Sequence, residues 1–363
     1  MYPDMKKPSP FTKISTWAKA HPKKAIAIAS VVIVLISAAI VFASLSNEPK
    51  PVAKTPVKTT PKPVEVKKYY SPLTGLEVKN EAATKMATTA IMLENSPDAR
   101  PQSGLKQSGV VYEAIAEGGI TRFLTIHQQD KPSLIGPVRS LRMYYVDWLA
   151  PYNASVAHVG GSANALAEVR NGNYRDIDQF FNATTYWRST DRFAPHNVYT
   201  SFERLDALNL AKGYTESTFD GFSRIDGKPV ETPDASSIAV TISGPTYNSS
   251  YAYDKATNTY LRSQAGAPHT DQEDGQIAPS VVIALKVDMV KVLEDGYRES
   301  ITTTGTGEAV IFQNGTAQTV TWSKADRASQ LRFLDASGKD VPLVRGQAWI
   351  AAIPNGSGAV TWQ

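Results

Sequence analysis

Apolar positions are most concentrated near the start of the chain. Residues 25–45 read AIAIASVVIVLISAAIVFASL, a run of 21 positions without a charged side chain. A helix needs about 20 such residues to cross the hydrocarbon core of a bilayer, so the pattern predicts one transmembrane helix. A cleaved signal peptide is the alternative, because Val41 and Ala43 could stand before a cleavage point. The apolar part of a signal peptide spans only about 7–15 residues, which favours an uncleaved anchor.

The segments on either side of this helix predict its orientation. Six lysines precede it and four follow it closely. Because the more basic flank of a single-pass helix tends to stay inside the cell, we expect residues 1–24 to form a cytoplasmic basic tail. The rest of the chain would then lie outside the plasma membrane. Residues 46–69 repeat proline and lysine with almost nothing to bury, which predicts an extended linker.

Residues 70–213 alternate short apolar runs with helical periodicity, which is typical of a mixed α/β domain. Strands are expected at 89–94 and 155–159. Ser140 is the expected cap of a helix over 141–149. Further helices are expected from residue 163, between a Ser162 cap and a Gly172 stop, and at about 202–211.

The pattern changes after a connection, residues 214–235, that is marked by glycine and proline. Residues 236–363 show repeated strand patterns separated by turns. Asn314-Gly315 is a strong hairpin signal, and Ser337-Gly338 marks another turn. The sequence therefore predicts a β-rich carboxy-terminal domain that follows the α/β domain.

The segment VYEAIAEGGITRF, residues 111–123, carries three charges among apolar neighbours. If its two glycines form the turn of a hairpin, Glu117 pairs with Ile120, Ile115 with Arg122, and Glu113 with Leu124. Glu113, Glu117 and Arg122 would then share one face of the sheet. One arginine bridging two carboxylates explains this pattern structurally, whereas a functional site is the alternative.

Several loops combine glycine or proline turns with Arg, Asp, His or Asn, a mixture expected at strand ends that form a site. Arg139 and Arg142 stand three apart at the predicted start of a helix. Their guanidinium groups can bind a carboxylate or phosphate in two-pronged fashion, or pair with a local acid such as Asp147. Asp191, with His196-Asn197 and nearby aromatic residues, would suit a sugar or peptide groove, or a loop pinned to the core.

Residues 158–162 read HVGGS and connect a predicted strand to a predicted helix. Free backbone N–H groups at Gly160, Gly161 and Ser162 would favour an anion beside His158. The structural alternative is a tight turn with an ordinary serine cap. No phosphate-loop signature follows, because the Gly-Lys-Ser/Thr triplet is missing.

Charge and motif content exclude several kinds of binding and catalysis. The overall charge is +4, but residues 1–69 hold 12 lysines and 3 acids, which leaves 26 basic and 31 acidic side chains, a net of −5, in residues 70–363. That balance argues against nucleic-acid binding. The chain has no cysteine, which excludes thiolate chemistry and disulfides. No metal-binding or cofactor-binding motif occurs, so we expect neither a metal nor a cofactor.

Six ordered motifs resemble the YerB-like family of bacterial envelope lipoproteins, a two-domain family of unknown function. They are KYYSPLTGLEV from Lys68, ENSPDARPQSGL from Glu94, VYEAIAEGGITRF from Val111, IGPVRSLR from Ile135, HVGGS from His158 and DRFAPHNVYTS from Asp191. The carboxy-terminal region is similar through GTGEAVIFQNG, TWSK and FLDASGKDVPLVRGQAWIAAIP. The resemblance implies an extracytoplasmic, membrane-tethered protein without assigned catalytic residues. Such lipoproteins attach through a cysteine, so here the uncleaved helix would replace the lipid.

Together these observations lead to a binding hypothesis. We expect a membrane-anchored envelope protein whose α/β domain holds an anionic or carbohydrate-containing ligand, such as a cell-wall glycan or peptide. The expected ligand-binding residues are Glu117, Arg122, Arg139, Arg142, His158, Gly160, Gly161, Ser162, Asp191, His196 and Asn197. A wall hydrolase with paired carboxylates from Glu94, Glu113 and Glu117, and a scaffold that docks another envelope protein, are the alternatives.

Overall fold

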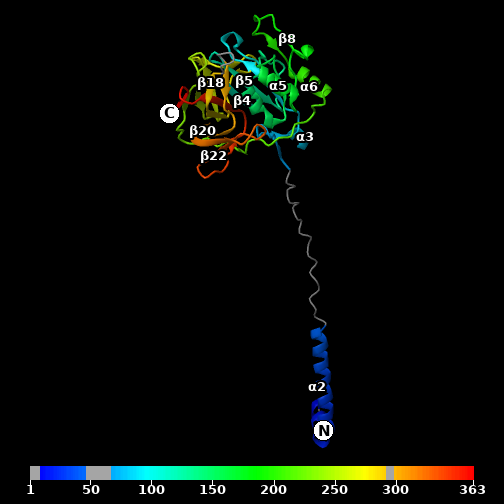
Figure 1. Ribbon diagram of the computed structural model, residues 1–363. Coiled ribbons are helices and arrows are strands. Elements are labelled where there is room, and N and C mark those ends of the chain that lie inside the picture. Colours follow the sequence, from blue (N-terminus) through cyan, green and yellow to red (C-terminus); the bar gives the residue numbers. More distant parts are fainter. Residues whose placement is uncertain (1–8, 46–66, 292–297) are drawn as a thin grey trace, which may run out of the picture. The chain divides into compact units, whose positions relative to one another are not determined.

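The computed structural model describes residues 9–45, 67–291 and 298–363, which form two separate units (Figure 1). The first contains helices α1 (Pro10–Ala20) and α2 (Pro22–Leu45). Helix α2 has 24 residues, or about 36 Å at 1.5 Å per residue, and it confirms the expected apolar helix of membrane-spanning length. The predicted linker lies outside the described residues except for its last three positions, as do residues 1–8 of the predicted tail.

The second unit, residues 67–363, is built on a sheet of ten strands. In spatial order they are β22 (Arg332–Leu334), β21 (Thr316–Lys324), β20 (Gly305–Gln313), β17 (Val281–Val287), β24 (Ala348–Pro354), β4 (Val110–Glu117), β5 (Ile120–His127), β3 (Thr89–Glu94), β6 (Ser155–Ala157) and β7 (Arg175–Asp176). Five strands come from each of the two predicted regions. They meet where β24 pairs with β4 in parallel, Val110 lying opposite Ala348.

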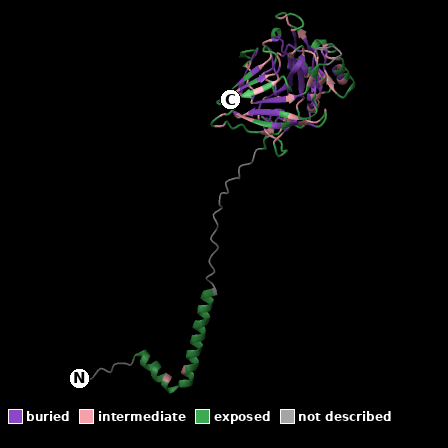
Figure 2. Cartoon of the chain, turned by 60° about the vertical axis from the view of Figure 1, so that its left-hand side comes forward, coloured by how far each residue is buried: buried purple, intermediate pink, exposed green. Residues whose placement is uncertain are grey.

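Both faces of this sheet are covered, which explains why β3 is buried at every position. Helices α4 (Met143–Leu149) and α5 (Ala163–Asn171) pack on one face, in a core that includes Tyr112 and Trp148. The other face packs against a five-stranded sheet and helix α6 (Phe202–Ala211), in a core that includes Phe123 and Trp349. Figure 2 shows the buried strands enclosed by exposed loops.

The remaining elements are short or belong to the second sheet. That sheet has the order β14 (Ala267–Pro268), β13 (Thr259–Gln264), β12 (Ser249–Asp254), β11 (Ser237–Thr241) and β25 (Ala359–Trp362). The small strands are β1 (Tyr69–Tyr70), β2 (Glu77–Val78), β8 (Trp187–Arg188), β9 (Val198–Tyr199), β10 (Arg224–Ile225), β15 (Thr270–Asp271), β16 (Gly275–Gln276), β18 (Met289–Lys291), β19 (Glu299–Ile301) and β23 (Leu343–Val344). The small helices are α3 (Glu81–Thr84), η1 (Pro97–Ala99), η2 (Ala150–Tyr152) and η3 (Ala183–Thr185).

Two local predictions need correction. In the β4–β5 hairpin Glu117 pairs with Ile120 as expected, but an irregularity between Ile115 and Glu117 shifts the register by one residue. Glu113 therefore lies opposite Phe123, and Arg122 opposite Ala114. A one-residue shift exchanges the two faces of a strand, so the predicted shared face of Glu113 and Arg122 is wrong.

The second correction concerns the start of α4. The helix begins at Met143 rather than at residue 141, and its N-cap is Arg142 in an extended conformation. The cause is a pairing with the turn after β6, because Leu141 donates its N–H to the carbonyl of Gly160 and accepts from Ser162. Arg139 consequently lies in extended chain before the helix.

Candidate functional site

The extended segment between β5 and α4 crosses the carboxyl ends of two strands of the large sheet. Glu94, the last residue of β3, donates its N–H to the carbonyl of Pro137 over 3.0 Å. Arg139 donates to Met92 of β3 over 2.8 Å and accepts from Val159, just beyond β6, over 3.1 Å. This segment therefore brings side chains from β3, β4, β5 and the β6–α5 turn to one edge of the sheet, which we call the polar edge.

Glu94 is the centre of the first group of side chains at the polar edge. Its Oε1 accepts from Nδ1 of His196 over 2.9 Å and from the Ser96 hydroxyl over 3.0 Å, and Arg139 Nε lies 3.3 Å away. The Glu94 side chain is 5% exposed, whereas those of Arg139 and His196 are 25% and 23% exposed. A buried carboxylate thus holds a guanidinium and an imidazole that both reach solvent.

This group has unused hydrogen-bonding capacity. The second carboxylate oxygen of Glu94 and Nε of Arg139 are buried and find no hydrogen-bond partner among the described residues. Leaving a buried polar atom without a hydrogen bond costs about 1–3 kcal/mol, and most native proteins satisfy such atoms. A ligand or a water molecule with both donor and acceptor atoms would complete the arrangement.

Glu117 is the centre of the second group. Its two oxygens accept separately, Oε1 from Arg122 over 2.7 Å and Oε2 from Arg142 over 2.7 Å. Arg122 also donates to the carbonyl of Ser140 over 2.6 Å. Burial opposes ionisation of Glu117, but the two guanidinium groups outweigh it and hold the pKa of that carboxyl below its usual value. This confirms the predicted contact of Glu117 with Arg122 and adds Arg142.

Arg142 and Ser162 line a pocket of about 280 Å³ together with residues of α4, α5 and β19. Asp147, which was one predicted partner of Arg139 or Arg142, instead accepts from Arg327 over 2.6 Å and from Thr303 over 2.7 Å. The two arginines at the polar edge are therefore held by glutamates at the ends of β3 and β4.

His158 lies behind the polar edge and is fully buried. Its Nε2 faces Asp176 Oδ1 at 2.9 Å and its Nδ1 faces the carbonyl of Gly160 at 2.8 Å. Each ring nitrogen of His158 therefore faces an oxygen that accepts hydrogen bonds. Burial would raise the pKa of Asp176, but its hydrogen bond and charge interaction with His158 outweigh this and lower it.

The glycine turn after His158 already donates a hydrogen bond to a carboxylate of the protein itself. The N–H of Gly160 donates to Asp178 Oδ1 over 3.1 Å, and the N–H of Ser162 donates to Leu141 over 3.1 Å. The Asp178 side chain is fully buried and also accepts from Arg170 over 2.8 Å. In this conformation the expected backbone donors thus serve internal acceptors, and Gly161 lies against the backbone of Leu141.

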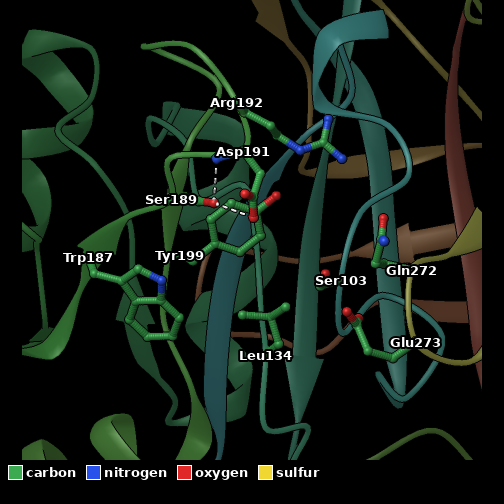
Figure 3. A pocket seen from close by; sticks show the side chains of 9 residues that line it. All are labelled: Ser103, Leu134, Trp187, Ser189, Asp191, Arg192, Tyr199, Gln272 and Glu273. Carbon is green, nitrogen blue, oxygen red and sulfur yellow. Dashed lines mark hydrogen bonds between the residues drawn. The ribbon is translucent and has the colours of Figure 1, made fainter.

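The loop between β8 and β9 has two sides. His196 points to Glu94, whereas Asp191 lines a second pocket of about 340 Å³, shown in Figure 3. Asn197 is buried and fixes the loop, since its Nδ2 donates to the carbonyls of Ser189 and Arg192 over 3.0 and 3.2 Å. Three lining residues that sequence reasoning missed are Ser103, Gln272 and Glu273. Ser103 lies within the motif ENSPDARPQSGL without standing out in it, and no motif marks Gln272 and Glu273, which lie beyond the predicted domain boundary.

Glu113 is an interior residue. It is 1% exposed, accepts from Arg262 over 2.8 Å and from the Trp349 indole over 3.0 Å. An acid/base role requires access to a substrate and to solvent. The buried position of Glu113 is therefore incompatible with a role as a catalytic carboxylate. Its function is to join strand β4 to strands β13 and β24.

These features define a class of protein with an apolar amino-terminal helix and a folded region in which an α/β part and a β-rich part share one sheet. The chain belongs to the YerB-like family. Residues 73–215 match the family described as "Protein of unknown function (DUF3048) N-terminal domain", and residues 238–350 match its C-terminal domain.

Comparisons with individual proteins agree with this assignment. The chain is 32% identical over 299 residues to YerB of Bacillus subtilis (strain 168), described as a candidate lipoprotein, covering 81% of this chain and 88% of YerB. The crystal structure of YerB from Bacillus subtilis matches with a TM-score of 0.72 and 28% identity, over 81% of this chain and 99% of that one. With helix α2, the family assignment indicates association with a membrane or the cell envelope.

Proposed function

We propose that residues 67–363 bind an anionic or carbohydrate-containing ligand outside the plasma membrane, and that a cell-wall component is the natural ligand. The observation that carries this proposal is the Glu94 group. Arg139 and His196 carry nitrogen donors, are partly exposed, and are fixed by one buried carboxylate. Fixed guanidinium and imidazole donors are suited to a carboxylate or phosphate of a ligand.

Arg142 supports the same proposal from the neighbouring pocket. Glu117 orients its guanidinium through two hydrogen bonds, of 3.1 and 2.7 Å, so little side-chain entropy remains to be lost on binding. Arg142 lines this pocket and Arg122 does not, so the part of Arg122 would be to hold Glu117 rather than to touch the ligand. His158 would act in the same indirect way, by fixing the β6–α5 turn.

The test is binding of purified residues 67–363 to cell-wall sacculi and to soluble anionic wall fragments. This region forms one compact unit with its own cores, so it can be studied without the helix. We expect Arg139→Ala and His196→Ala each to weaken binding about tenfold, the loss of one charge-assisted hydrogen bond. Arg332→Ala is the matched control, because Arg332 is exposed on β22 at the opposite end of the sheet. Equal binding by all four proteins would refute the proposed site.

A wall hydrolase is the second candidate, and the Glu94–His196 contact favours it. A carboxylate and an imidazole 2.9 Å apart, with the imidazole open to solvent, could act as a general acid/base pair. Release of soluble fragments from sacculi would be measured for the wild type and for Glu94→Gln and His196→Gln. Turnover that is lost in both variants would favour the enzyme, whereas unchanged turnover would exclude this pair.

The proposed orientation has its own test, because the chain contains no cysteine. Single cysteines at the exposed positions Ser15 and Ser337 would be labelled in intact cells with a membrane-impermeant maleimide. We expect labelling only at Ser337→Cys, since we propose that the tail is cytoplasmic and the folded region external. Labelling at Ser15→Cys alone would show that the orientation is opposite to the proposed one.

A further inference from the structure

The pocket in Figure 3 lies between the β8–β9 loop and the β15–β16 hairpin, away from the Glu94 side of the loop. Its volume is about 340 Å³, within the range of small-molecule sites, about 300–1,000 Å³. The lining residues are Ser103, Leu134, Trp187, Ser189, Asp191, Arg192, Tyr199, Gln272 and Glu273. Both predicted sequence regions contribute to it.

The hairpin wall of the pocket is anchored by Asp271, which is 2% exposed. Its Oδ2 accepts from the N–H groups of Leu105 and Lys106 over 2.6 and 3.0 Å, and its Oδ1 accepts from the N–H of Glu273 over 3.2 Å. The N–H of Gln272 donates to the carbonyl of Gln102 over 2.7 Å. The backbone that presents Gln272 and Glu273 is therefore fixed.

The loop wall is fixed in a similar way. Arg192 donates to the carbonyls of Asp98 and Pro101 over 2.6 and 2.8 Å, so its terminal nitrogens are committed to backbone. The Arg204 guanidinium lies over the Trp187 ring, 4.8 Å from its centroid. A half-buried indole held in this way gives the pocket a rigid aromatic surface.

The remaining polar groups are carboxylates, hydroxyls and an amide. Asp191 accepts from the Ser189 hydroxyl over 3.1 Å, which leaves its other oxygen available (Figure 3). Glu273 and Gln272 supply further acceptors, and Gln272 also supplies donors. Two carboxylates against one guanidinium give these groups a net negative charge, which disfavours an anion, whereas acceptors of this kind suit sugar hydroxyl groups.

We propose that this pocket binds a neutral pyranose residue of an oligosaccharide, with the ring against Trp187 and its hydroxyl groups donating to Asp191 and Glu273. The inference rests on the proposed function and deepens it, because it assigns the carbohydrate part of the ligand to this pocket and leaves the anionic part to Arg139 and His196.

The experiment titrates residues 67–363 with uncharged β-1,4-linked N-acetylglucosamine oligosaccharides and follows the indole N–H signals by two-dimensional NMR. Trp187→Phe identifies the Trp187 signal by its loss. We expect that signal to shift on titration, and we expect Trp187→Ala and Glu273→Gln each to weaken binding about tenfold. Phe193→Ala is the matched control, since Phe193 is an aromatic residue of the same loop that is 92% exposed and does not line the pocket.

Two results would overturn the inference: no shift with any uncharged oligosaccharide, or equal affinity of Trp187→Ala and the wild type. Arg139→Ala separates this outcome from failure of the proposed function. If anionic wall fragments bind through Arg139 but uncharged sugars do not bind, only the pocket assignment fails. If uncharged sugars bind at Trp187 while the binding of wall fragments does not depend on Arg139 or His196, the pocket assignment holds and the anion site fails.

Discussion

The ion pair between Glu113 and Arg262 gives the sharpest stability prediction. The two residues are 1% and 0% exposed, and Arg262 donates to Glu113 over 2.8 Å. We expect Arg262→Met to lower the free energy of unfolding by about 3–5 kcal/mol, because removing one partner leaves a buried charge uncompensated. A loss of this size is a large part of the about 5–15 kcal/mol typical of folded domains.

The contacts explain this magnitude. Arg262 also donates to Gln264 over 2.8 Å and to His269, and its guanidinium lies 4.4 Å from the centre of the Trp349 ring. In the variant, Glu113 would keep the Trp349 indole and the Thr121 hydroxyl as donors, at 3.0 and 3.2 Å. Two neutral donors do not replace a guanidinium, so the carboxylate remains unneutralised inside the protein.

Urea unfolding of residues 67–363, followed by circular dichroism, measures the effect. The Glu113→Leu/Arg262→Met double variant should be more stable than Arg262→Met alone, because it buries no charge at this position. Lys255→Met is the control, since its partner Glu231 is 99% exposed and such pairs contribute about 0–1 kcal/mol. If Arg262→Met and Lys255→Met lose similar amounts, the ion pair does not hold the two sheets together.

Three further outcomes are expected. A chain that ends at residue 235 should not fold, because β4 would lose its neighbour β24, and an unfolded circular dichroism spectrum would check this. Burial lowers the pKa of His127 to about 3; the unfolded chain therefore takes up a proton there below about pH 6.5, and stability falls with acid. His127→Phe should reduce the change in the free energy of unfolding with pH by up to about 1.4 kcal/mol per pH unit. An unchanged pH dependence would contradict this expectation. Gly136→Ala should destabilise the fold by at least about 1 kcal/mol in urea, since φ is +155° and a Cβ would lie 2.6 Å from the Tyr199 ring.

Local features of the fold could be predicted from the sequence. Helix α5 lies between Ser162 and Gly172 as expected, although the Ser162 side chain makes no capping hydrogen bond, and the turn at Asn314-Gly315 connects β20 to β21. Such features depend on neighbouring residues, whose caps and turn conformations follow local rules. The short apolar run of residues 89–94 likewise predicts strand β3, and the structure adds that the strand is buried on both faces.

Long-range pairing could not be predicted in the same way. The bulge in β4 moves Glu113 to the opposite face, and nothing in residues 111–123 marks that shift. The parallel pairing of β4 with β24 joins regions that differ in their sequence patterns. For the candidate site, the residue types indicated which side chains could bind a ligand, but the sequence did not predict which of them contact one another. Arg139 and His196 meet at Glu94 although they come from separate loops.

The position of β24 has a consequence for biogenesis. This strand lies between β17 and β4 in the middle of the large sheet, yet it follows both of them in the sequence. Proteins are made from the amino terminus, so the sheet stays open along its centre until residues 348–354 have been made. A nascent chain in this state keeps two unpaired apolar strand edges, which other chains could add to. Binding of a chaperone until β24 is added would protect these edges from mispairing.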